Sequence, residues 1–457
     1  MTATLSPPKT TAWQHQANAL NFVQGKAAAM LAMDMGTGKS RVVVDLVRER
    51  GYRRVLILCP LSVVPVWPQQ FATHWSLMAA TVVALNDGAV ADKKHRADLS
   101  LRSNVSPTVV VINYESAWRQ PFAAWAIGQS WDLIVLDESH RVKAPGGKAS
   151  WFCKMLGRRT DQRLCLTGTP MPHSPLDIYA QYRFLNPYVF GTSFTRFKLR
   201  YAIPDPRFPG RVVGYRNEDE LQEKYQSIAF RVRAADVLDL PPVQHIERTV
   251  ALEPAASRIY QDLERRFYAD VDAGTVTPAN ALVKLLRLQQ VTGGFVRDDD
   301  GTDHDVGQEK AGVLKDLLDD LDPSEPVVVF GRFRHDLDTV HRVAMALDRR
   351  SAELSGRRNE LADWQAGDAP ILAVQIQSGG VGIDLTRARY CVYLSLGFSL
   401  GDYEQSLARV HRPGQTRPTF YYHILAESTV DSQVYKALRA RKDVVAAILE
   451  APRDRHD

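Results

Sequence analysis

The sequence predicts an α/β fold in which one architecture occurs twice. Short apolar, β-branched runs alternate with helical stretches between about residues 27 and 167, and again between 327 and 425. Continuous apolar runs of this kind indicate parallel strands that are covered on both faces. A chain of 457 residues is also long enough for two large domains. We therefore expect two lobes, each a parallel sheet flanked by helices, with helical insertions between them.

The first set of expected strands is Ala27–Met33, Val55–Cys59, Thr81–Leu85, Val109–Ile112, Leu133–Leu136 and Arg163–Thr167. The second set is Val327–Phe330, Ile371–Val374, Tyr390–Leu394 and Phe420–Leu425. Between the two sets, from about Asn186 to Asp319, strand signals are few. Helices are expected there at Leu221–Phe230, Pro254–Val271 and Asn280–Gln290, because apolar residues recur at helical spacing.

The dipeptide Pro241-Pro242 ends a stiff, extended break that begins at Asp239, and this break is the expected link between the lobes. The expected domains are an N-terminal lobe at residues 1–235, which includes a helical protrusion at about 186–230, a linker with a second helical protrusion at 236–310, and a C-terminal lobe at 311–457. No repeat or low-complexity tract interrupts this plan.

The composition is that of a globular protein of the cell interior. No window holds the run of about 18 apolar residues that a membrane helix needs, and the N-terminus has no apolar signal core. Four scattered cysteines without a CxxC pair argue against a disulfide framework or a zinc ribbon and fit a reducing compartment. The net charge of +5 permits a polyanionic partner without requiring one.

A glycine-rich segment, Met35-Gly36-Thr37-Gly38-Lys39-Ser40, follows the first expected strand and precedes a helical run, Arg41–Arg50. Glycines allow backbone N–H groups to close around phosphate oxygens, and the helix N-terminus adds partial positive charge. Lys39 would reach the β- and γ-phosphates of ATP, and the Ser40 hydroxyl would bind Mg²⁺. The first glycine of the full P-loop pattern is missing, because its position holds Met33.

An acidic pair, Asp137-Glu138, follows the apolar strand Leu133–Leu136 about a hundred residues downstream. Asp137 would hold the metal through water, and Glu138 would orient and deprotonate the attacking water. Either motif alone is also explained by an ordinary turn that binds no ligand. Together and in this order they predict hydrolysis of ATP with Mg²⁺.

From these two motifs onward the series resembles the Swi/Snf-type ATPases of helicase superfamily two, over about Trp13 to Lys442. Ala32–Ser40 (AMDMGTGKS) is similar to a family loop that begins with alanine, which accounts for Met33. The resemblance implies two RecA-like lobes and a DNA-dependent motor. Gln16 matches the glutamine that reads adenine in the family.

The resemblance also implies residues in the first lobe that contact DNA or couple it to ATP. Cys59–Trp67 resembles a DNA-contacting motif with Ser62 and Trp67, and Val111–Glu115 resembles a strand-end motif with Asn113 and Tyr114. Leu166–Pro170 resembles the segment through which Thr167, Gly168 and Thr169 would couple the γ-phosphate to DNA. His173 stands where the family has asparagine, so the polar group at this position differs from that of the family.

In the second lobe, Phe330–Phe333 with Arg332, and Ser378–Thr386 (SGGVGIDLT), resemble further family boxes. Ser378 and Gly379 would contact DNA, whereas Gly382 and Asp384 would contact the nucleotide, with Asp384 replacing the commoner asparagine. Gln405–Gln415 carries Arg409 and Arg412, which lie three residues apart and so on one helical face. One or both would complete the ATP site as arginine fingers, worth about 10³–10⁵ in rate.

Double-stranded DNA is the favoured partner, and single-stranded DNA or RNA stay possible. Arg196–Arg216 holds six basic residues and four aromatics, which suits contact with a phosphate backbone and stacking on bases. An exposed loop with buried aromatics explains the segment equally well. We expect a monomeric motor without membrane contact, in the cytoplasm or nucleoid of a bacterium or virus.

Three alternatives stay open. The first is a strand-separating, annealing or fork-remodelling helicase of the same superfamily, and the second is an RNA-dependent ATPase. The third is a nucleotide-gated DNA-binding switch that hydrolyses ATP slowly. The motifs do not indicate the biological process, the polarity or step size of translocation, or the protein partners.

Overall fold

The computed structural model describes residues 8–75, 80–103, 107–172, 174–206, 212–272, 278–298, 300–377 and 383–450. The chain divides into two compact units, Met1–Asp239 with Asp443–Asp457, and Leu240–Lys442. The division after Asp239 lies inside the extended break expected between the lobes. The finer boundaries expected at 235 and 310 stay predictions.

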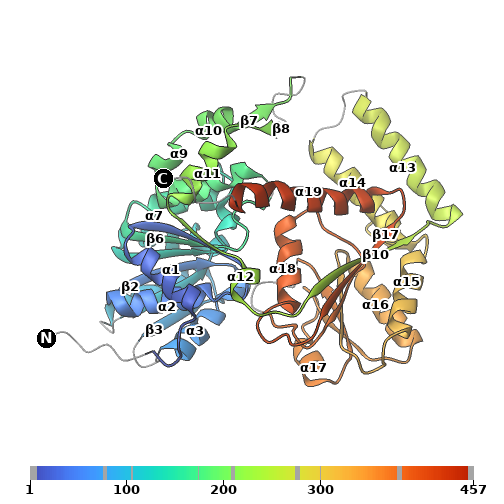
Figure 1. Ribbon diagram of the computed structural model, residues 1–457, viewed down its shortest axis with the longest axis horizontal. Helices are drawn as coiled ribbons and strands as arrows, with labels where there is room; N and C mark the ends of the chain where they lie inside the picture. The colour runs from blue at the N-terminus through green and yellow to red at the C-terminus, as the bar shows by residue number, and fades with distance from the viewer. Residues whose placement is uncertain are drawn as a thin grey trace. The chain divides into compact units, whose positions relative to one another are not determined.

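A seven-stranded sheet forms the centre of the first unit (Figure 1). Its order is β3-β4-β2-β5-β6-β1-β9, and every neighbouring pair is parallel. The strands are β1 (Ala28–Met33), β2 (Arg54–Cys59), β3 (Thr81–Leu85), β4 (Thr108–Asn113), β5 (Trp131–Asp137), β6 (Thr160–Leu166) and β9 (Ala229–Val232). Four of the five interior strands, β1, β2, β4 and β5, are almost wholly buried, as an apolar strand between two helical layers must be.

Helices of the first unit are α1 (Gln14–Gln24), α2 (Lys39–Arg50), α3 (Val66–His74), α4 (Val90–Arg102), α5 (Tyr114–Ala117), α6 (Phe122–Gly128), α7 (Lys148–Leu156), α8 (Ile178–Leu185), α9 (Pro187–Phe190), α10 (Phe194–Tyr201), α11 (Glu218–Gln226) and α12 (Ala234–Val237). Short 3₁₀ turns are η1 (Leu61–Val63), η2 (Ser139–Val142) and η3 (Pro175–Asp177), and β7 (Ala202–Pro204) pairs with β8 (Val212–Tyr215) as an antiparallel hairpin.

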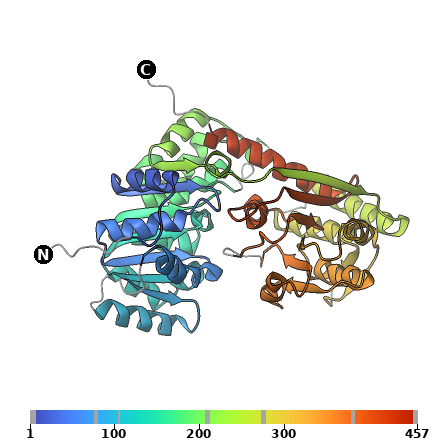
Figure 2. The ribbon, with the colours of Figure 1, turned by 60° about the horizontal axis from the view of Figure 1, so that its bottom comes forward.

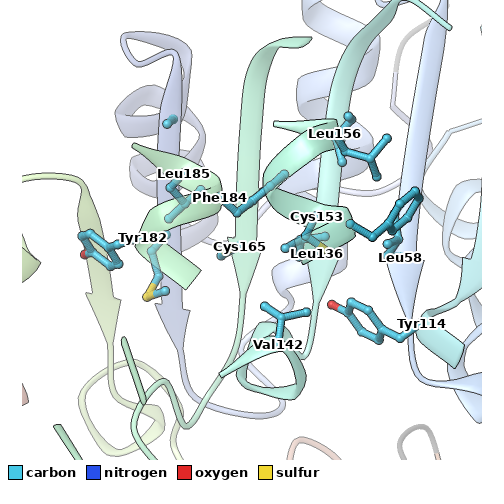
Figure 3. Close-up of a cluster of buried hydrophobic side chains, with 14 of the residues drawn as sticks. Leu58, Tyr114, Leu136, Val142, Cys153, Leu156, Cys165, Tyr182, Phe184 and Leu185 are labelled. Atoms are coloured by element: carbon cyan, nitrogen blue, oxygen red, sulfur yellow. The ribbon is translucent and has the colours of Figure 1, made fainter. Parts of the chain in front are cut away.

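One face of this sheet carries a large core that α4 to α11 cover. Figure 3 shows its centre, where Leu58, Leu136 and Cys165 project from three strands against Leu156 and Phe184 of α7 and α8. The alternation of side chains along a strand puts these residues on one face. The carboxyl ends of the strands are thereby held in fixed register, and the predicted site residues follow those ends.

The helix expected at Leu221–Phe230 is wrong in its last part. α11 ends at Gln226, and Ala229–Val232 forms β9, which pairs in parallel with β1. Ile228 continues the helical spacing of Leu221 and Tyr225, whereas Ile228 and Phe230, two residues apart, have the spacing of a strand. Pairing with β1 decides the outcome, because it satisfies backbone groups along that strand's outer edge.

The second unit has a six-stranded parallel sheet of order β10-β17-β16-β13-β15-β14. Its strands are β10 (Val243–Val250), β13 (Val327–Gly331), β14 (Ser351–Leu354), β15 (Ile371–Gln375), β16 (Tyr390–Tyr393) and β17 (Thr419–Ala426). Its helices are α13 (Pro254–Asp272), α14 (Pro278–Thr292), α15 (Glu309–Asp319), α16 (Arg334–Ala346), α17 (Leu361–Ala366), α18 (Leu400–Val410) and α19 (Val430–Glu450). A small hairpin joins β11 (Phe295–Arg297) to β12 (Asp303–Asp305). Separate apolar clusters cover the sheet's two faces.

The expectation of few strands between residues 186 and 319 is wrong. β10 forms an eight-residue edge strand directly after the Pro241-Pro242 break, and it lies beside β17 (Figure 2). Its side chains are exposed or half-buried along its whole length, so its sequence lacks the apolar run by which central strands are recognised. Both lobes are thus RecA-like α/β units, as expected from the sequence.

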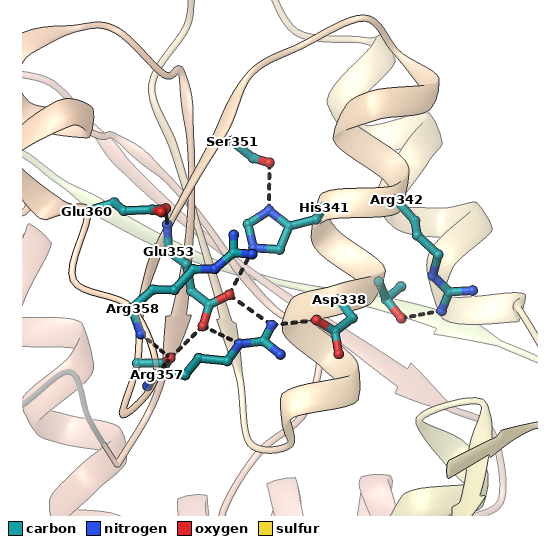
Figure 4. Close-up of polar contacts among 10 residues, drawn as sticks. Asp338, His341, Arg342, Ser351, Glu353, Arg357, Arg358 and Glu360 are labelled. Carbon is teal, nitrogen blue, oxygen red and sulfur yellow. Dashed lines mark hydrogen bonds and ion pairs between the residues drawn. The ribbon is translucent and has the colours of Figure 1, made fainter. Parts of the chain in front are cut away.

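The edge strand β14 carries a buried acidic residue, Glu353, whose side chain is fully covered. Its carboxylate accepts hydrogen bonds from Arg357 at 2.8 and 2.9 Å and from Ser355, and it lies 3.0 Å from Nε2 of His341 (Figure 4). Burial alone would raise the pKa of Glu353. The hydrogen bonds from Arg357, Ser355 and His341 outweigh burial and hold the pKa at about 2.

Glu353→Gln is expected to lower the free energy of unfolding by about 1.5–3 kcal/mol at neutral pH, because three charged or polar partners lose an ionised acceptor. Since the folded pKa lies below the ordinary value of 4.5, this stabilisation is complete above pH 4.5 and is lost as the pH falls toward 2. Denaturant unfolding of wild type and Glu353→Gln across this pH range measures the difference in the free energy of unfolding.

Asp338→Asn serves as control, because Asp338 pairs with the same Arg357 but is 51% exposed. This substitution should lower the free energy of unfolding by at most about 1 kcal/mol. A difference between wild type and Glu353→Gln that is independent of pH would contradict the assignment.

Candidate active site

The glycine-rich segment forms a tight loop between β1 and α2. Gly36 and Gly38 adopt φ values of 80° and 81°, in the left-handed region that favours glycine. A Cβ atom on Gly38 would lie 2.2 Å from Nε2 of Gln16, so the end of that side chain would have to move. The backbone conformation therefore favours glycine at Gly36 and Gly38, and the close approach of Gln16 adds a second reason at Gly38. α2 begins at Lys39, so its N-terminal N–H groups face the loop.

Lys39 and Gln16 both bond to the backbone of this loop. The Lys39 ammonium donates to the carbonyls of Met33 (2.8 Å) and Asp34 (3.3 Å). The Gln16 amide donates to the carbonyl of Thr37 (3.2 Å), and its oxygen accepts from the N–H of Trp13 (3.0 Å). Phosphate oxygens are acceptors of the same kind as these carbonyls. The lysine is thus already held within the loop that would bind phosphate.

Asp137 is the last residue of β5, at the carboxyl end of the parallel strands, where the phosphate loop also follows β1. Its side chain is buried. Its carboxylate accepts from the indole N–H of Trp67 (3.2 Å), and its backbone carbonyl accepts from the hydroxyl of Tyr114 (2.8 Å). Both partners are themselves buried in the first unit. The predicted contacts of Trp67 and Tyr114 with DNA stay predictions, and the structure adds a role that the sequence did not reveal, which is to hold Asp137 in place.

The electrostatics of the acidic pair suit a divalent cation. Burial, and then the neighbouring Glu138, raise the pKa of Asp137 to about 7, while the charge of Lys39 acts in the opposite direction. Two carboxylates on consecutive buried residues are costly without compensating positive charge. Carboxylate and hydroxyl oxygens are also the ligands that Mg²⁺ prefers. Asp137 and Ser40 therefore fit the metal that accompanies ATP.

Glu138 adopts an unusual backbone conformation, with φ of 51°. Its N–H donates to Asp137 Oδ1 (3.0 Å). Among the described residues its Oε2 accepts no hydrogen bond although it is buried, and it lies 3.4 Å from Nδ1 of His140. Burial lowers the pKa of His140 to about 4, so this imidazole is neutral at neutral pH. Glu138 thus keeps a carboxylate oxygen available for a proton.

The Thr167–Pro170 segment follows β6 and lies beside both motifs. The N–H of Thr167 donates to the carbonyl of Leu31 (3.2 Å), which belongs to β1. The Thr167 hydroxyl lies 3.3 Å from His140 Nδ1 and accepts from the N–H of Thr169 (3.1 Å). A Cβ atom on Gly168 would meet the backbone of the phosphate loop at 3.5 Å. This segment is therefore in contact with the acidic turn and with the phosphate loop.

Other predicted residues of the first unit lie in varied surroundings. Ser62 is exposed, as a DNA contact requires, whereas Asn113 is buried and accepts from Lys93 (3.3 Å). In the basic stretch, Phe197 and Tyr201 belong to the core, which fits the alternative of buried aromatics for these two residues rather than stacking on bases. Arg200 pairs with Glu220 at 2.6 Å. Residues 207–211 of that stretch, and His173, lie outside the described residues.

The two arginines of the second unit do not share one helical face, which corrects the sequence expectation. α18 ends at Val410, so Arg409 lies in its last turn and Arg412 in the loop beyond it. Arg409 is 6% exposed, whereas Arg412 is half-buried and donates to the carbonyl of Ile383 (3.2 Å). Gln415 fixes this loop by donating to the carbonyl of Ala388 (2.7 Å).

Arg332 follows β13 and is tied into the second unit. Its N–H donates to Asp336 (2.9 Å), its guanidinium bonds to Gln289, and the guanidinium carbon lies 4.4 Å from the ring centre of Phe398. Asp384 is exposed and accepts from the N–H of Thr386 (2.9 Å). Ser378, Gly379 and Gly382 lie outside the described residues. The roles expected for these five residues stay predictions.

Sequence reasoning missed several residues that support the site. Asp34, next to the phosphate loop, lies 3.3 Å from the guanidinium of Arg231 and accepts from the N–H of Ala234 (3.0 Å). Gln181, on α8, bonds to the residue after Glu138. The sequence gives no local signal for these contacts, because the partners lie far apart along the chain. Only pairing of β9 with β1 could have pointed to Arg231.

Comparison with known protein families gives two matches. The SNF2-related domain matches residues 15–293, and the helicase conserved C-terminal domain matches residues 309–414. The first match alone covers more than half of the chain and includes the phosphate loop and the acidic pair. The second includes Arg409 and Arg412.

Similar proteins come from phage, yeast and animals. A protein of Acyrthosiphon pisum secondary endosymbiont phage 1 is 24% identical over 91% of this chain and 93% of its own length. A DNA repair and recombination protein of Saccharomyces cerevisiae is 24% identical over 89% of this chain and 50% of its own. A Caenorhabditis elegans homologue of a SWI/SNF-related matrix-associated, actin-dependent regulator of chromatin is 26% identical over 92% of this chain and 59% of its own. The chain thus spans about half the length of these two eukaryotic relatives. The SWI2/SNF2 ATPase core of Sulfolobus solfataricus, solved in complex with double-stranded DNA, matches 98% of this chain and 95% of its own with a TM-score of 0.47 and 20% identity.

Proposed function

The chain belongs to the SNF2-related family of helicase-like, DNA-dependent ATPases, and from that premise we propose that it uses ATP hydrolysis to translocate along double-stranded DNA. The observation that carries the proposal is that three segments follow the carboxyl ends of three neighbouring strands in the first sheet. The phosphate loop follows β1, the acidic pair ends β5, and Thr167–Pro170 follows β6, which lies between these two strands in the sheet.

The first unit holds a nucleotide site, and we assign ATP and Mg²⁺ to it. On binding, Lys39 would exchange the carbonyls of Met33 and Asp34 for phosphate oxygens, and Gln16 would face the adenine. Ser40 and Asp137 would hold Mg²⁺, which neutralises charge on the phosphates during their transfer. The buried, electrostatically crowded carboxylate of Asp137 favours such a cation.

Glu138 serves as the base that orients the attacking water and takes its proton. Its buried Oε2 accepts no hydrogen bond among the described residues, so the oxygen is available. Because the lowered pKa of His140 keeps its imidazole neutral, His140 does not form an ion pair with the Glu138 carboxylate, which stays available to the attacking water. Arg409 and Arg412 of the second unit would stabilise charge on the γ-phosphate, as arginine fingers do.

We propose double-stranded DNA as the track because the two family matches include both the ATP-binding motifs and the segment with Arg409 and Arg412. In addition, one relative is named for DNA repair and recombination and another for regulation of chromatin. In the first unit Arg196 and Arg216 are not buried, and Ser62 is exposed, so they can reach a phosphate backbone. No helix in the described part of the chain is long and apolar enough to cross a bilayer.

Steady-state hydrolysis tests the proposal. With duplex DNA we expect turnover to rise above the basal rate and to grow with duplex length, because a translocating motor runs off short tracks early. Stimulation should fall as salt rises, since phosphate contacts release counterions. Preferential stimulation by RNA or by short single strands would contradict the duplex assignment. Equal turnover on short and long duplexes would contradict translocation.

Translocation and strand separation are distinguished by two displacement assays on the same DNA. A motor that moves along duplex DNA without opening it displaces the third strand of a triplex but leaves the duplex paired. We expect triplex displacement only. Release of a duplex strand at a comparable rate would identify a strand-separating helicase instead, and slow hydrolysis without either displacement would identify a nucleotide-gated switch.

A further inference from the structure

Gln181 occupies a position between the acidic turn and the Thr167–Pro170 segment. It lies on α8 and is completely buried. Its side-chain oxygen accepts from the Ser139 hydroxyl (2.7 Å), and its amide donates to the carbonyls of Pro170 (2.7 Å) and Asp177 (3.0 Å). Both donors and the acceptor of the amide are thus used. A buried amide with three good bonds fixes the separation of the groups that it joins.

The bond to Ser139 matters because Ser139 is the residue after Glu138. Glu138 has φ of 51°, a left-handed conformation that is strained for a residue other than glycine. Such a conformation persists only where the surroundings fix the chain on both sides. On one side the N–H of Glu138 bonds to Asp137, and on the other the Ser139 side chain bonds to Gln181.

The bond to Pro170 links this turn to the phosphate loop. Pro170 belongs to the segment whose Thr167 bonds to β1 and whose Gly168 packs against the loop backbone. Gln181 therefore relates the position of the acidic turn to that of the loop that would bind phosphate. A second link runs from His140 to Thr167, but at 3.3 Å between side-chain atoms it is longer than the contacts of Gln181.

We propose that Gln181 is a positioning residue for ATP hydrolysis, which holds Glu138 in its left-handed conformation through Ser139. This inference rests on the proposed function, since it concerns the orientation of the base in that reaction. The side-chain hydrogen bonds of Gln181 go to Ser139, Pro170 and Asp177, and none of these residues is among those expected to contact ATP. Its loss should consequently lower the catalytic rate and leave nucleotide affinity almost unchanged.

The test compares Gln181→Leu with a matched control, Gln162→Leu. Gln162 is also buried in the first unit, donates to two backbone carbonyls, those of Val23 and Lys26 at 2.9 Å each, and accepts from the hydroxyl of Tyr52. It lies near the amino end of β6, opposite the end from which the site is built. The two variants lose the same number and kind of hydrogen bonds, so they should lose similar stability.

For Gln181→Leu we expect a fall in kcat of roughly 10- to 100-fold, as a misplaced catalytic group produces, with KM for ATP and the affinity for a fluorescent ATP analogue within about threefold of wild type. Gln162→Leu should keep the kcat of wild type. Ser139→Ala removes only the hydroxyl and should reproduce the loss of kcat. The double variant should have a kcat no lower than that of Gln181→Leu, because both changes break the same hydrogen bond between Ser139 and Gln181.

Two results overturn the inference. One is a kcat of Gln181→Leu equal to that of Gln162→Leu, and the other is a Ser139→Ala variant with the kcat of wild type. The second result decides the matter alone if Gln181→Leu does not fold. Failure of the proposed function is recognised separately, because it appears in the wild-type protein as absence of DNA-stimulated hydrolysis.

Discussion

Glu138→Gln should lower DNA-stimulated ATP turnover by about 10²–10⁴-fold, the range that a positioned general base contributes. Glutamine keeps the size and the hydrogen-bonding oxygen of the side chain but cannot accept a proton from water. The buried Oε2 of Glu138 accepts no hydrogen bond in the described part of the chain, so the substitution removes no hydrogen bond to that oxygen and changes only its 3.4 Å contact with His140 Nδ1. Nucleotide affinity should be retained, and the variant should accumulate bound ATP.

Single-turnover hydrolysis and equilibrium titration with ATP measure the two halves of this prediction. Asp132→Asn is the matched control, because Asp132 lies on the same strand but near its amino end, where it accepts from the N–H groups of Arg53 (2.7 Å) and Arg54 (2.9 Å). The control should turn over ATP normally. Normal turnover in Glu138→Gln would show that Glu138 is not the base, and a loss of ATP affinity would show that its charge serves binding.

Arg412→Ala should lower turnover by about 10³–10⁵-fold if this residue is the arginine finger. Arg412 is half-buried and lies in the loop after α18, where it bonds to the carbonyl of Ile383. Arg409 is 6% exposed within the helix and is therefore the less accessible of the two. We expect Arg412→Ala to retain folding and ATP affinity, because the phosphate loop belongs to the first unit.

Arg412→Lys separates charge from shape, because lysine keeps the positive charge but cannot form the planar, two-pronged contact of arginine. We expect it to recover only a small part of the activity. Arg342→Ala provides the control, since this arginine of α16 is 42% exposed and pairs with Asp305 away from the loop. Full activity in Arg412→Ala would assign the finger role to Arg409 instead, and Arg409→Ala would then be the inactive variant.

The central strands of both sheets could be predicted from the sequence, whereas three strands at the edges could not. β1, β2, β4 and β5 are buried on both faces and so read as continuous apolar runs. β9 and β14 have only four residues, and β10 is exposed or half-buried along its length, with apolar residues only at Val243, Ile246 and Val250. An edge strand has a single neighbour and needs few apolar residues, so its existence depends on that neighbour rather than on its own sequence.

The site shows the same division between local and distant signals. The phosphate loop and the acidic pair are contiguous motifs whose chemistry follows from residue type and spacing. The hydrogen bonds of Trp67 and Tyr114 to Asp137, and of Gln181 to Ser139, join residues between 23 and 70 positions apart. No spacing rule applies at such separations. The prediction that Arg412 shares a helical face with Arg409 is wrong for a related reason. The helical pattern through Arg409 does not reveal that the helix ends at Val410.

Pairing of β9 with β1 has a consequence for synthesis of the chain on the ribosome. Met30 pairs with Ala229, so about two hundred residues separate the partners. Until Val232 has been synthesised, the strand that leads into the phosphate loop has an uncovered edge of free N–H and C=O groups. Such an edge is a template for pairing with another nascent chain. A fragment that stops before Ala229 should therefore aggregate, even though it contains the phosphate loop and the acidic pair complete.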